Sequence, residues 1–225
     1  MATINGSVSH WFTELPQPRP PLPGDRDADV CIVGAGYTGL WTAYYLKKAD
    51  PSLRITILEA RFAGFGASGR NGGWLSGLAP GHRGLLAKQY GRDSVVAWQK
   101  TLNDAVDEVI DVARLEGIEA DIVKGGNLEV ARNAAQAKRL RAEMDEDREW
   151  GTEDVELLTA AEASQRIHVD NLVLGSFNPH CARIQPAKLA RGLAEVVERL
   201  GVTIYEQTPV TTISAGRAQT PQGVV

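Results

Sequence analysis

The sequence predicts an α/β fold in which a parallel βαβ domain is interrupted by a mainly helical (α+β) segment. A β-branched strand over 29–33 leads into a glycine-rich turn, a helix over 40–48 and a second apolar strand over 54–58. Strands joined by a helix in this order pair in parallel. After residue 84 the pattern changes to long helices, and short apolar strands return only near residue 202. The sheet is therefore expected to resume after an insertion.

The first 28 residues precede this unit and are rich in proline. Because proline fixes its own φ and restrains the residue before it, the segment is predicted to be extended. Its prolines include Pro16, Pro18, Pro20, Pro21 and Pro23. We expect a lead-in that packs on the domain surface, anchored by His10, Trp11 and Phe12, with a partner-binding segment as the alternative.

The inserted region begins with a predicted helix of about 20 residues. Apolar residues that recur every three or four positions define one face of it: Val95, Trp98, Leu102, Val106, Val109 and Ala113. The rest of the insertion predicts, in order, a strand around Leu128 and Val130, a helix over 134–150 stopped by Gly151, a helix capped by Thr159 and Glu162, and a strand over 172–177.

The last part of the chain returns to the sheet. Pro186 suits the first turn of a helix that runs to Leu200. A strand over 202–205 and a hairpin around Gly216 follow. The predicted domains are the lead-in over 1–28, a partial Rossmann-like domain over 29–84 and 185–225, and the inserted segment over 85–184.

Composition narrows the classes of function. The net charge of −4 comes from mixed acidic and basic residues, so nucleic acid is not an expected partner. No apolar run reaches the roughly 18 residues of a membrane span, and two cysteines fit a reducing compartment, so a cytoplasmic protein without a membrane partner is expected. The histidines form no metal-ligand spacing, and no metal is expected.

The glycine-rich turn predicts a dinucleotide site. Gly34, Gly36 and Gly39 have G-x-G-x-x-G spacing between a predicted strand and a predicted helix. The first permits the tight turn, the second lets the main chain approach a diphosphate, and the third allows the helix to pack closely on the strand. Glu59 lies 20 residues beyond Gly39 at the end of the second strand, where a carboxylate accepts hydrogen bonds from the adenosine ribose. A carboxylate there also disfavours NADP, because a 2′-phosphate would meet like charge.

The stretch over 61–74 decides between a flavin and a nicotinamide dinucleotide. It is rich in glycine and follows Glu59 without an intervening helix, so its main chain can run close to a flat, extended ligand. An NAD domain normally passes straight into another helix here. Ser68 and Arg70 are suited to donate to a diphosphate. FAD is therefore the expected cofactor, and an NAD-dependent dehydrogenase is the less favoured enzyme.

These motifs resemble the D-amino-acid-oxidase-like family of FAD-dependent amine and amino-acid oxidoreductases, and most of all its bacterial branch of gamma-glutamylputrescine oxidase and glycine/sarcosine-oxidase-like enzymes. The resemblance is carried by DVCIVGAGYTGLW at 29–41, ILEAR at 57–61 and GASGRNGG at 66–73, and it continues through GGNL at 125–128, NPH at 178–180, QPAKL at 185–189 and GVTIY at 201–205.

The resemblance implies a set of cofactor-binding residues: Gly34, Ala35, Gly36, Tyr37, Thr38, Gly39, Glu59, Ala60, Arg61, Ser68, Arg70, Asn71, Gly72, Gly73 and, through its main chain near adenine, Val210. It also implies oxidation of a C–N bond in a small amine or amino acid by hydride transfer to the flavin. No catalytic residue is assigned, because a neutral amine needs no strong base. His82, His168 and His180 are expected to be structural.

The family fold leaves and re-enters the FAD domain twice, and only the first excursion and return have counterparts here. The chain is accordingly expected to be incomplete relative to the family, as a fragment or truncated product. A non-catalytic, nucleotide-binding remnant and one chain of a larger flavoenzyme, completed by a second polypeptide, are the alternatives. The substrate and the electron acceptor stay open.

Overall fold

The computed structural model describes residues 8–12 and 17–225, and the chain divides into two compact units. The first unit holds the described residues up to Gly73 together with Val112–Asp121 and Ile184–Val225. The second holds Trp74–Asp111 and Ile122–Arg183. The domain limits expected from the sequence assign 74–84 and 112–121 differently and stay a prediction. Within the predicted lead-in, residues 1–7 and 13–16, Pro16 among them, lie outside the described residues.

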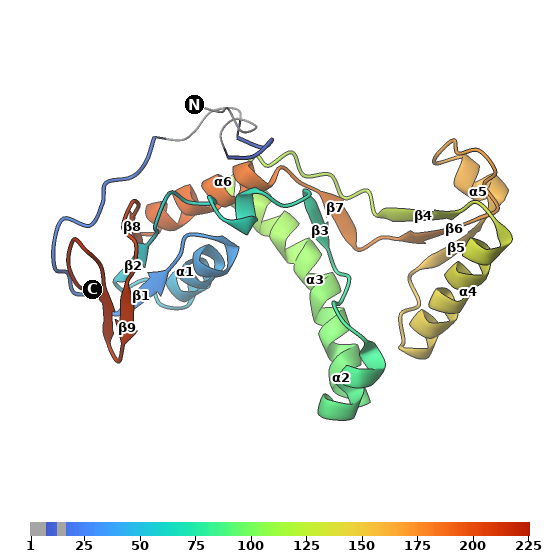
Figure 1. The fold of residues 1–225 in the computed structure, drawn as a ribbon, viewed down its shortest axis with the longest axis horizontal. Coiled ribbons are helices and arrows are strands. Elements are labelled where there is room, and N and C mark those ends of the chain that lie inside the picture. The colour runs from blue at the N-terminus through green and yellow to red at the C-terminus, as the bar shows by residue number, and fades with distance from the viewer. Residues whose placement is uncertain (1–7, 13–16) are drawn as a thin grey trace. The chain divides into compact units, whose positions relative to one another are not determined.

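A parallel sheet forms the centre of the first unit (Figure 1). Its strands β1 (Val30–Val33), β2 (Ile55–Leu58) and β8 (Thr203–Tyr205) pair in the order β1-β2-β8. All four residues of the middle strand β2 are buried, whereas Val33 on the edge strand β1 is 49% exposed. The parallel βαβ unit predicted from the sequence is confirmed, including the return of the chain to the same sheet at β8.

Two helices pack against each other in this unit, α1 (Tyr37–Ala49) and α6 (Pro186–Arg199). Pro186 occupies the first turn of α6, and the side chain of Gln185 caps it by accepting a hydrogen bond from the Lys188 amide at 2.7 Å. The buried faces of both helices and β2 supply most of the largest fully buried side chains of this unit: Leu40, Tyr44, Ile55, Ile57, Leu58, Leu189, Leu193, Val196 and Val197. The unit also holds the short 3-10 turn η2 (Ala67–Gly69) and the hairpin β9 (Thr212–Ser214) with β10 (Arg217–Gln219).

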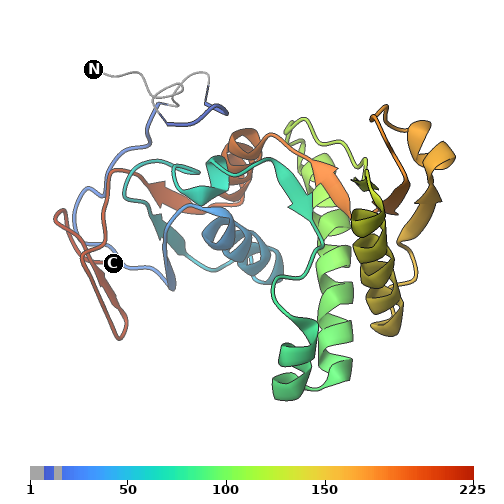
Figure 2. The same ribbon diagram turned by 45° about the vertical axis from the view of Figure 1, so that its right-hand side comes forward.

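The second unit contains an antiparallel sheet in the order β4-β6-β5, built from β4 (Asn127–Ala131), β6 (Leu174–Asn178) and β5 (Glu156–Thr159). Helix α4 (Ala134–Glu149) runs along this sheet (Figure 2), where Ala137 and Leu140 meet Ala131 and Leu174. The short helix α5 (Ala160–Ser164) begins with the predicted capping box of Thr159 and Glu162. A second antiparallel pair joins β3 (Trp74–Ser76) to β7 (Cys181–Arg183), and helix α2 (Arg83–Tyr90) precedes the long helix α3 (Arg92–Glu116).

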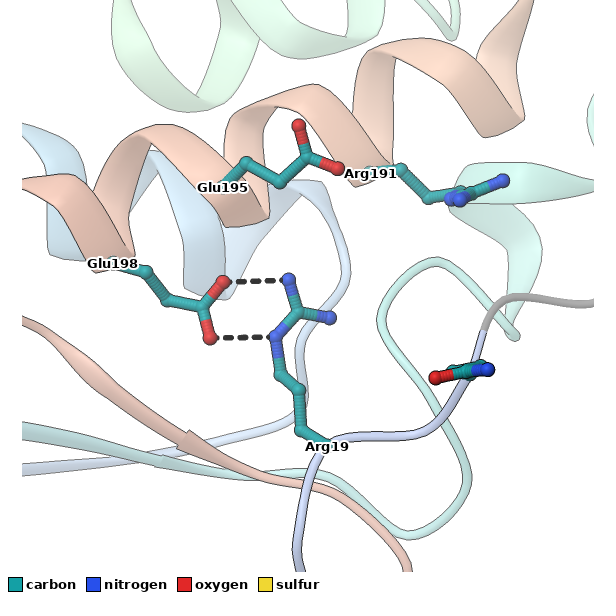
Figure 3. Close-up of a pocket in the computed structure, with 5 residues that line it drawn as sticks. Arg19, Arg191, Glu195 and Glu198 are labelled. Atoms are coloured by element: carbon teal, nitrogen blue, oxygen red, sulfur yellow. Dashed lines mark hydrogen bonds and ion pairs between the residues drawn. The ribbon is translucent and has the colours of Figure 1, made fainter.

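The described part of the lead-in lies on the first unit. The Arg19 guanidinium makes two parallel hydrogen bonds to the Glu198 carboxylate on α6, each 2.7 Å long (Figure 3). It also donates to Glu206 at 2.9 Å. Burial by itself lowers the pKa of Arg19, but the interactions with these two carboxylates outweigh it and raise the pKa. Farther along, the Leu22 amide donates to Thr208 Oγ1 at 3.0 Å. The lead-in is thus fixed by charge and by main-chain hydrogen bonds.

Among residues 8–12 and 17–225, no helix combines the length and the apolar composition that crossing a membrane requires.

Candidate functional site

Three glycines of the turn between β1 and α1 occupy positions where a side chain would strain the main chain or collide with a neighbour. Gly34 has a φ of +99°, in the left-handed region. A Cβ atom on Gly39 would lie 2.1 Å from the carbonyl oxygen of Gly34, and one on Gly36 would lie 2.9 Å from Ser68 Oγ. The turn therefore brings the first residues of α1 against β1 and against the Ser68 hydroxyl.

The N-terminus of α1 presents main-chain donors that no side chain of its own first turn neutralises. Gly36 is its N-cap residue, no side chain caps the helix, and no acidic residue lies in the first turn. The Tyr37 amide donates to Ser68 Oγ at 2.9 Å, which leaves the Ser68 hydroxyl hydrogen available to another acceptor. The amides of Thr38 and Gly39 have no hydrogen-bond partner among the described residues. Such a helix end attracts a diphosphate.

Glu59 links the glycine turn to the loop that follows β2. Its Oε2 accepts a hydrogen bond from the Ala35 amide at 2.8 Å, and its Oε1 accepts one from the Arg61 amide at 2.9 Å. A carboxylate offers about four acceptor positions, so about two stay free for ribose hydroxyls. Ala60, next to it, is exposed. The half-buried carboxylate thus combines a fixed orientation with unused acceptor capacity, as a ribose-binding residue requires.

Two arginines of the loop lie over one aromatic ring. The guanidinium carbon of Arg61 lies 4.8 Å from the ring centroid of Phe65, and that of Arg70 lies 4.5 Å from it. In the part of the chain that the structure describes, neither guanidinium has a carboxylate partner. Both side chains are exposed. Their guanidinium groups are therefore held over Phe65 and remain available to an anionic ligand.

The end of the loop is closed by side-chain hydrogen bonds. Asn71 accepts from the Gly73 amide at 2.8 Å and donates to the Ser68 carbonyl at 2.9 Å. Tyr37 reaches the same region. Burial raises the pKa of its hydroxyl, and a hydrogen bond with the Asn71 side chain offsets only part of this rise. The Tyr37 hydroxyl also donates to the Pro186 carbonyl at 2.9 Å, which ties the site to α6.

Val210 is the most distant predicted site residue in sequence, and it lies in the same unit. It packs against the buried cluster of Leu22, Leu58 and Ala218, and Leu58 directly precedes Glu59. No other described residue forms a hydrogen bond with the main chain of Val210. All fifteen predicted cofactor-binding residues belong to the first unit, and their contact with a ligand stays a prediction.

A carboxylate that the sequence analysis did not single out lies buried behind the site. Glu206, fully buried just after β8, accepts hydrogen bonds from the amides of Ala63 and Arg19 at 2.8 and 2.7 Å, in addition to its bond with the Arg19 guanidinium. It connects the lead-in to the loop that carries Arg61. No local signal in the sequence distinguishes it from a surface glutamate at a strand end.

Three of the four histidines, His82, His168 and His180, belong to the second unit. His180 is in the second unit, where its Nε2 contacts the Asp154 carboxylate, and His82 is the N-cap residue of α2. Within the described ranges no group of three or more His, Cys, Asp or Glu residues is arranged to hold a metal ion.

Known proteins match this chain over most of its length. Residues 29–225 match the family model described as FAD dependent oxidoreductase. The chain is 32% identical over 185 residues to gamma-glutamylputrescine oxidoreductase of Escherichia coli, which covers 82% of this chain and 43% of that protein. A form of L-amino acid deaminase from Proteus vulgaris that lacks its insertion sequence superposes with a TM-score of 0.71 at 20% identity, over 96% of this chain and 54% of that one.

L-α-glycerophosphate oxidase from Mycoplasma pneumoniae, solved with FAD bound, superposes with a TM-score of 0.63 at 21% identity, over 86% of this chain and 49% of that one. At these identities the two solved structures show the shared fold. The chain spans less than half of the length of the curated relatives with which it aligns.

Proposed function

The chain belongs to the family of FAD-dependent oxidoreductases, and from this premise we propose that it binds FAD and forms the cofactor-binding part of an enzyme that oxidises the C–N bond of a small amine or amino acid. FAD is the cofactor of this family. Bound FAD supplies the acceptor for a hydride from the carbon that bears the amine. No residue is assigned to the chemical step.

Two neighbouring features carry the proposal. Main-chain amides at the start of α1 have no hydrogen-bond partner among the described residues, and the Glu59 carboxylate has acceptor positions to spare. The free amides of Thr38 and Gly39 would donate to the diphosphate, with the Ser68 hydroxyl and the Arg61 and Arg70 charges beside them. The spare acceptor positions of Glu59 would receive the ribose hydroxyls. Every group of this set is complementary to one part of an adenine dinucleotide.

Two further features support a cytoplasmic location and the extension of the sheet by further strands. Cys31 and Cys181 are both free thiols, and burial raises the pKa of each, which suits a reducing compartment such as the cytoplasm. Strand β1 pairs only with β2 in the described part of the chain, so further strands, from a longer chain or from a second polypeptide, could extend the sheet at that edge.

The test is a titration of the apo form of the 225-residue chain with FAD, followed by flavin fluorescence. We expect saturable quenching that a Glu59→Lys variant loses and that a Glu143→Lys variant keeps, because Glu143 is an exposed residue of α4 far from the glycine turn in sequence. A chain that ignores FAD, or that binds NAD⁺ equally well, would refute the proposed cofactor.

Amine oxidation is tested next on the FAD-loaded protein. Diamines, N-methylated glycine and amino acids are added without oxygen, and loss of the oxidised flavin absorbance identifies a substrate. A protein that binds FAD but is bleached by none of these compounds would act as a nucleotide-binding chain without turnover of its own. If bleaching appears only after a co-purified second chain is added, this would support completion of the enzyme by a second polypeptide.

A further inference from the structure

We infer that residues 9–12 of the lead-in are part of the cofactor site, because they hold the end of the glycine-rich loop in the conformation that turns the Gly72 amide outward as a donor to the cofactor. The inference rests on the proposed function and names Trp11 as the positioning residue.

Two carbonyl groups of the loop are held by side chains of the lead-in. Trp11 Nε1 donates to the Asn71 carbonyl at 2.7 Å, and Ser9 Oγ donates to the Gly69 carbonyl at 3.2 Å. Both contacts join positions 60 residues apart in sequence. Both donors come from outside the loop, so the lead-in adds to the support that the Asn71 side chain gives from within it.

Aromatic rings of the lead-in also fill the space beneath the loop glycines. A Cβ atom on Gly69 would lie 2.9 Å from Phe12 Cζ, and one on Gly73 would lie 3.2 Å from Trp11 Cζ2. Phe12 is only 2% exposed and packs edge-on against Phe62 at a centroid distance of 5.4 Å. Glycine loops lose much conformational entropy on ordering, and this close contact restricts the loop on one side.

Because the peptide bond between Asn71 and Gly72 is trans, the hydrogen bond from Trp11 to the Asn71 carbonyl fixes the direction of the Gly72 N–H. The carbonyl of Asn71 and the N–H of Gly72 belong to one planar unit and point in opposite directions, and no cis peptide occurs among the described residues. With its carbonyl held against Trp11, this unit directs its N–H away from the lead-in. Gly72 is exposed, and its amide has no hydrogen-bond partner among the described residues.

The lead-in is also hydrogen-bonded to the residue that caps α6 in the first unit. Gln185 Nε2 donates to the Trp11 carbonyl at 2.9 Å, while Gln185 Oε1 caps α6. Gly73, one residue beyond Gly72, has a φ of +77° and accepts a hydrogen bond from the Ile184 amide at 2.9 Å. The free amide of Gly72 therefore lies between two hydrogen-bonded carbonyl groups, that of Asn71, held by Trp11 of the lead-in, and that of Gly73, held by Ile184 just after β7.

The test is the dissociation constant for FAD, measured on the full chain under native conditions. Trp11→Phe removes the indole donor and keeps an aromatic ring, and Gln185→Glu removes the donor to Trp11 while keeping an acceptor for the helix cap. One lost hydrogen bond changes affinity by roughly three- to tenfold, so each variant is expected to bind FAD that much more weakly. The matched control is Trp150→Phe, whose ring contacts Arg92 in the second unit and which should bind as the wild type does.

A double-mutant cycle separates positioning of the Gly72 amide from simple support of the fold. Gly72→Pro removes the N–H, so the effect of Trp11→Phe on FAD affinity should disappear in the Gly72→Pro background. Additive effects, or wild-type affinity in both Trp11→Phe and Gln185→Glu, would overturn the inference. Failure of the wild-type chain to bind FAD would overturn the proposed function itself, which is a different result.

Discussion

Replacing Gly39 by alanine is expected to weaken cofactor binding through a collision that the structure measures. The new Cβ would lie 2.1 Å from the Gly34 carbonyl oxygen and 3.1 Å from Ile32 Cγ2. To regain a 3.0 Å separation from that oxygen, which is about the shortest that Cβ atoms show, the first turn of α1 has to move by about 0.9 Å. The amides of Thr38 and Gly39 would move with it.

Forcing one methyl group into a well-packed contact costs about 1–3 kcal/mol. If the whole cost falls on the bound state, the dissociation constant for FAD rises roughly 5- to 150-fold. If part of it is already present in the free protein, the free energy of unfolding falls by that part. The experiment therefore measures both quantities, by FAD titration and by urea unfolding of the apoprotein.

The matched control is Gly66→Ala in the neighbouring loop. Gly66 has a φ of −72°, and a Cβ atom there would meet no other atom within 4 Å. We expect this variant to keep the affinity and stability of the wild type. If Gly39→Ala were as neutral as Gly66→Ala in both assays, the argument that the third glycine sets the distance between helix and strand would be wrong.

Three other predictions follow from the site and its surroundings. Glu59→Gln keeps an acceptor oxygen but loses the charge, so FAD should bind roughly tenfold more weakly in the fluorescence titration, with the exposed Glu149→Gln as an unchanged control. Arg19→Ala leaves the Glu206 side chain, 1% exposed, without its counter-charge and should lower the free energy of urea unfolding by about 3–5 kcal/mol; Arg148→Ala, from an exposed ion pair with Asp145, should cost less than about 1 kcal/mol. Hydrogen bonds from Arg54 lower the pKa of Asp29 from its ordinary 3.8 to about 2, so the stabilisation from this pair is complete above an ordinary carboxyl pKa and is lost as pH falls toward 2. The difference in urea midpoint between the wild type and Asp29→Asn should shrink from pH 7 to pH 3, and a constant difference would contradict the assignment.

Much of the first unit could be predicted because its signals are local. The strand, glycine turn and helix over 30–49, the proline that starts α6 and the capping box at Thr159 each depend on residues only a few positions apart. Strands β3 and β7 were not predicted, since each has three residues and they pair across more than 100 positions. Short segments of that kind carry no periodicity of their own, so tertiary pairing decides their structure.

The same distinction between local and distant contacts applies to the candidate site. The glycines and Glu59 lie at fixed spacings that predict a dinucleotide site from the sequence alone. The contacts that support these residues have no fixed spacing in the sequence. Arg19 donates a hydrogen bond to Glu206 across 187 positions, and Trp11 donates one to Asn71 across 60. A buried glutamate has no sequence pattern, and an aromatic residue in a proline-rich lead-in has many possible partners. The sequence therefore indicates which residues form the candidate site, but not the contacts that hold the site in shape.

The order of charges around the candidate site would set the direction of a bound dinucleotide. The carboxylate of Glu59 is fixed by the amides of Ala35 and Arg61, and no cation pairs with it among the described residues. Two residues later the chain places the first of two unpaired guanidinium groups over Phe65. An uncharged ribose is favoured at the carboxylate and an anionic diphosphate at the arginines, and reversing the ligand would place phosphate against Glu59. A 2′-phosphate on the ribose meets the same repulsion, so the arrangement that orients an adenine dinucleotide also selects against the phosphorylated form.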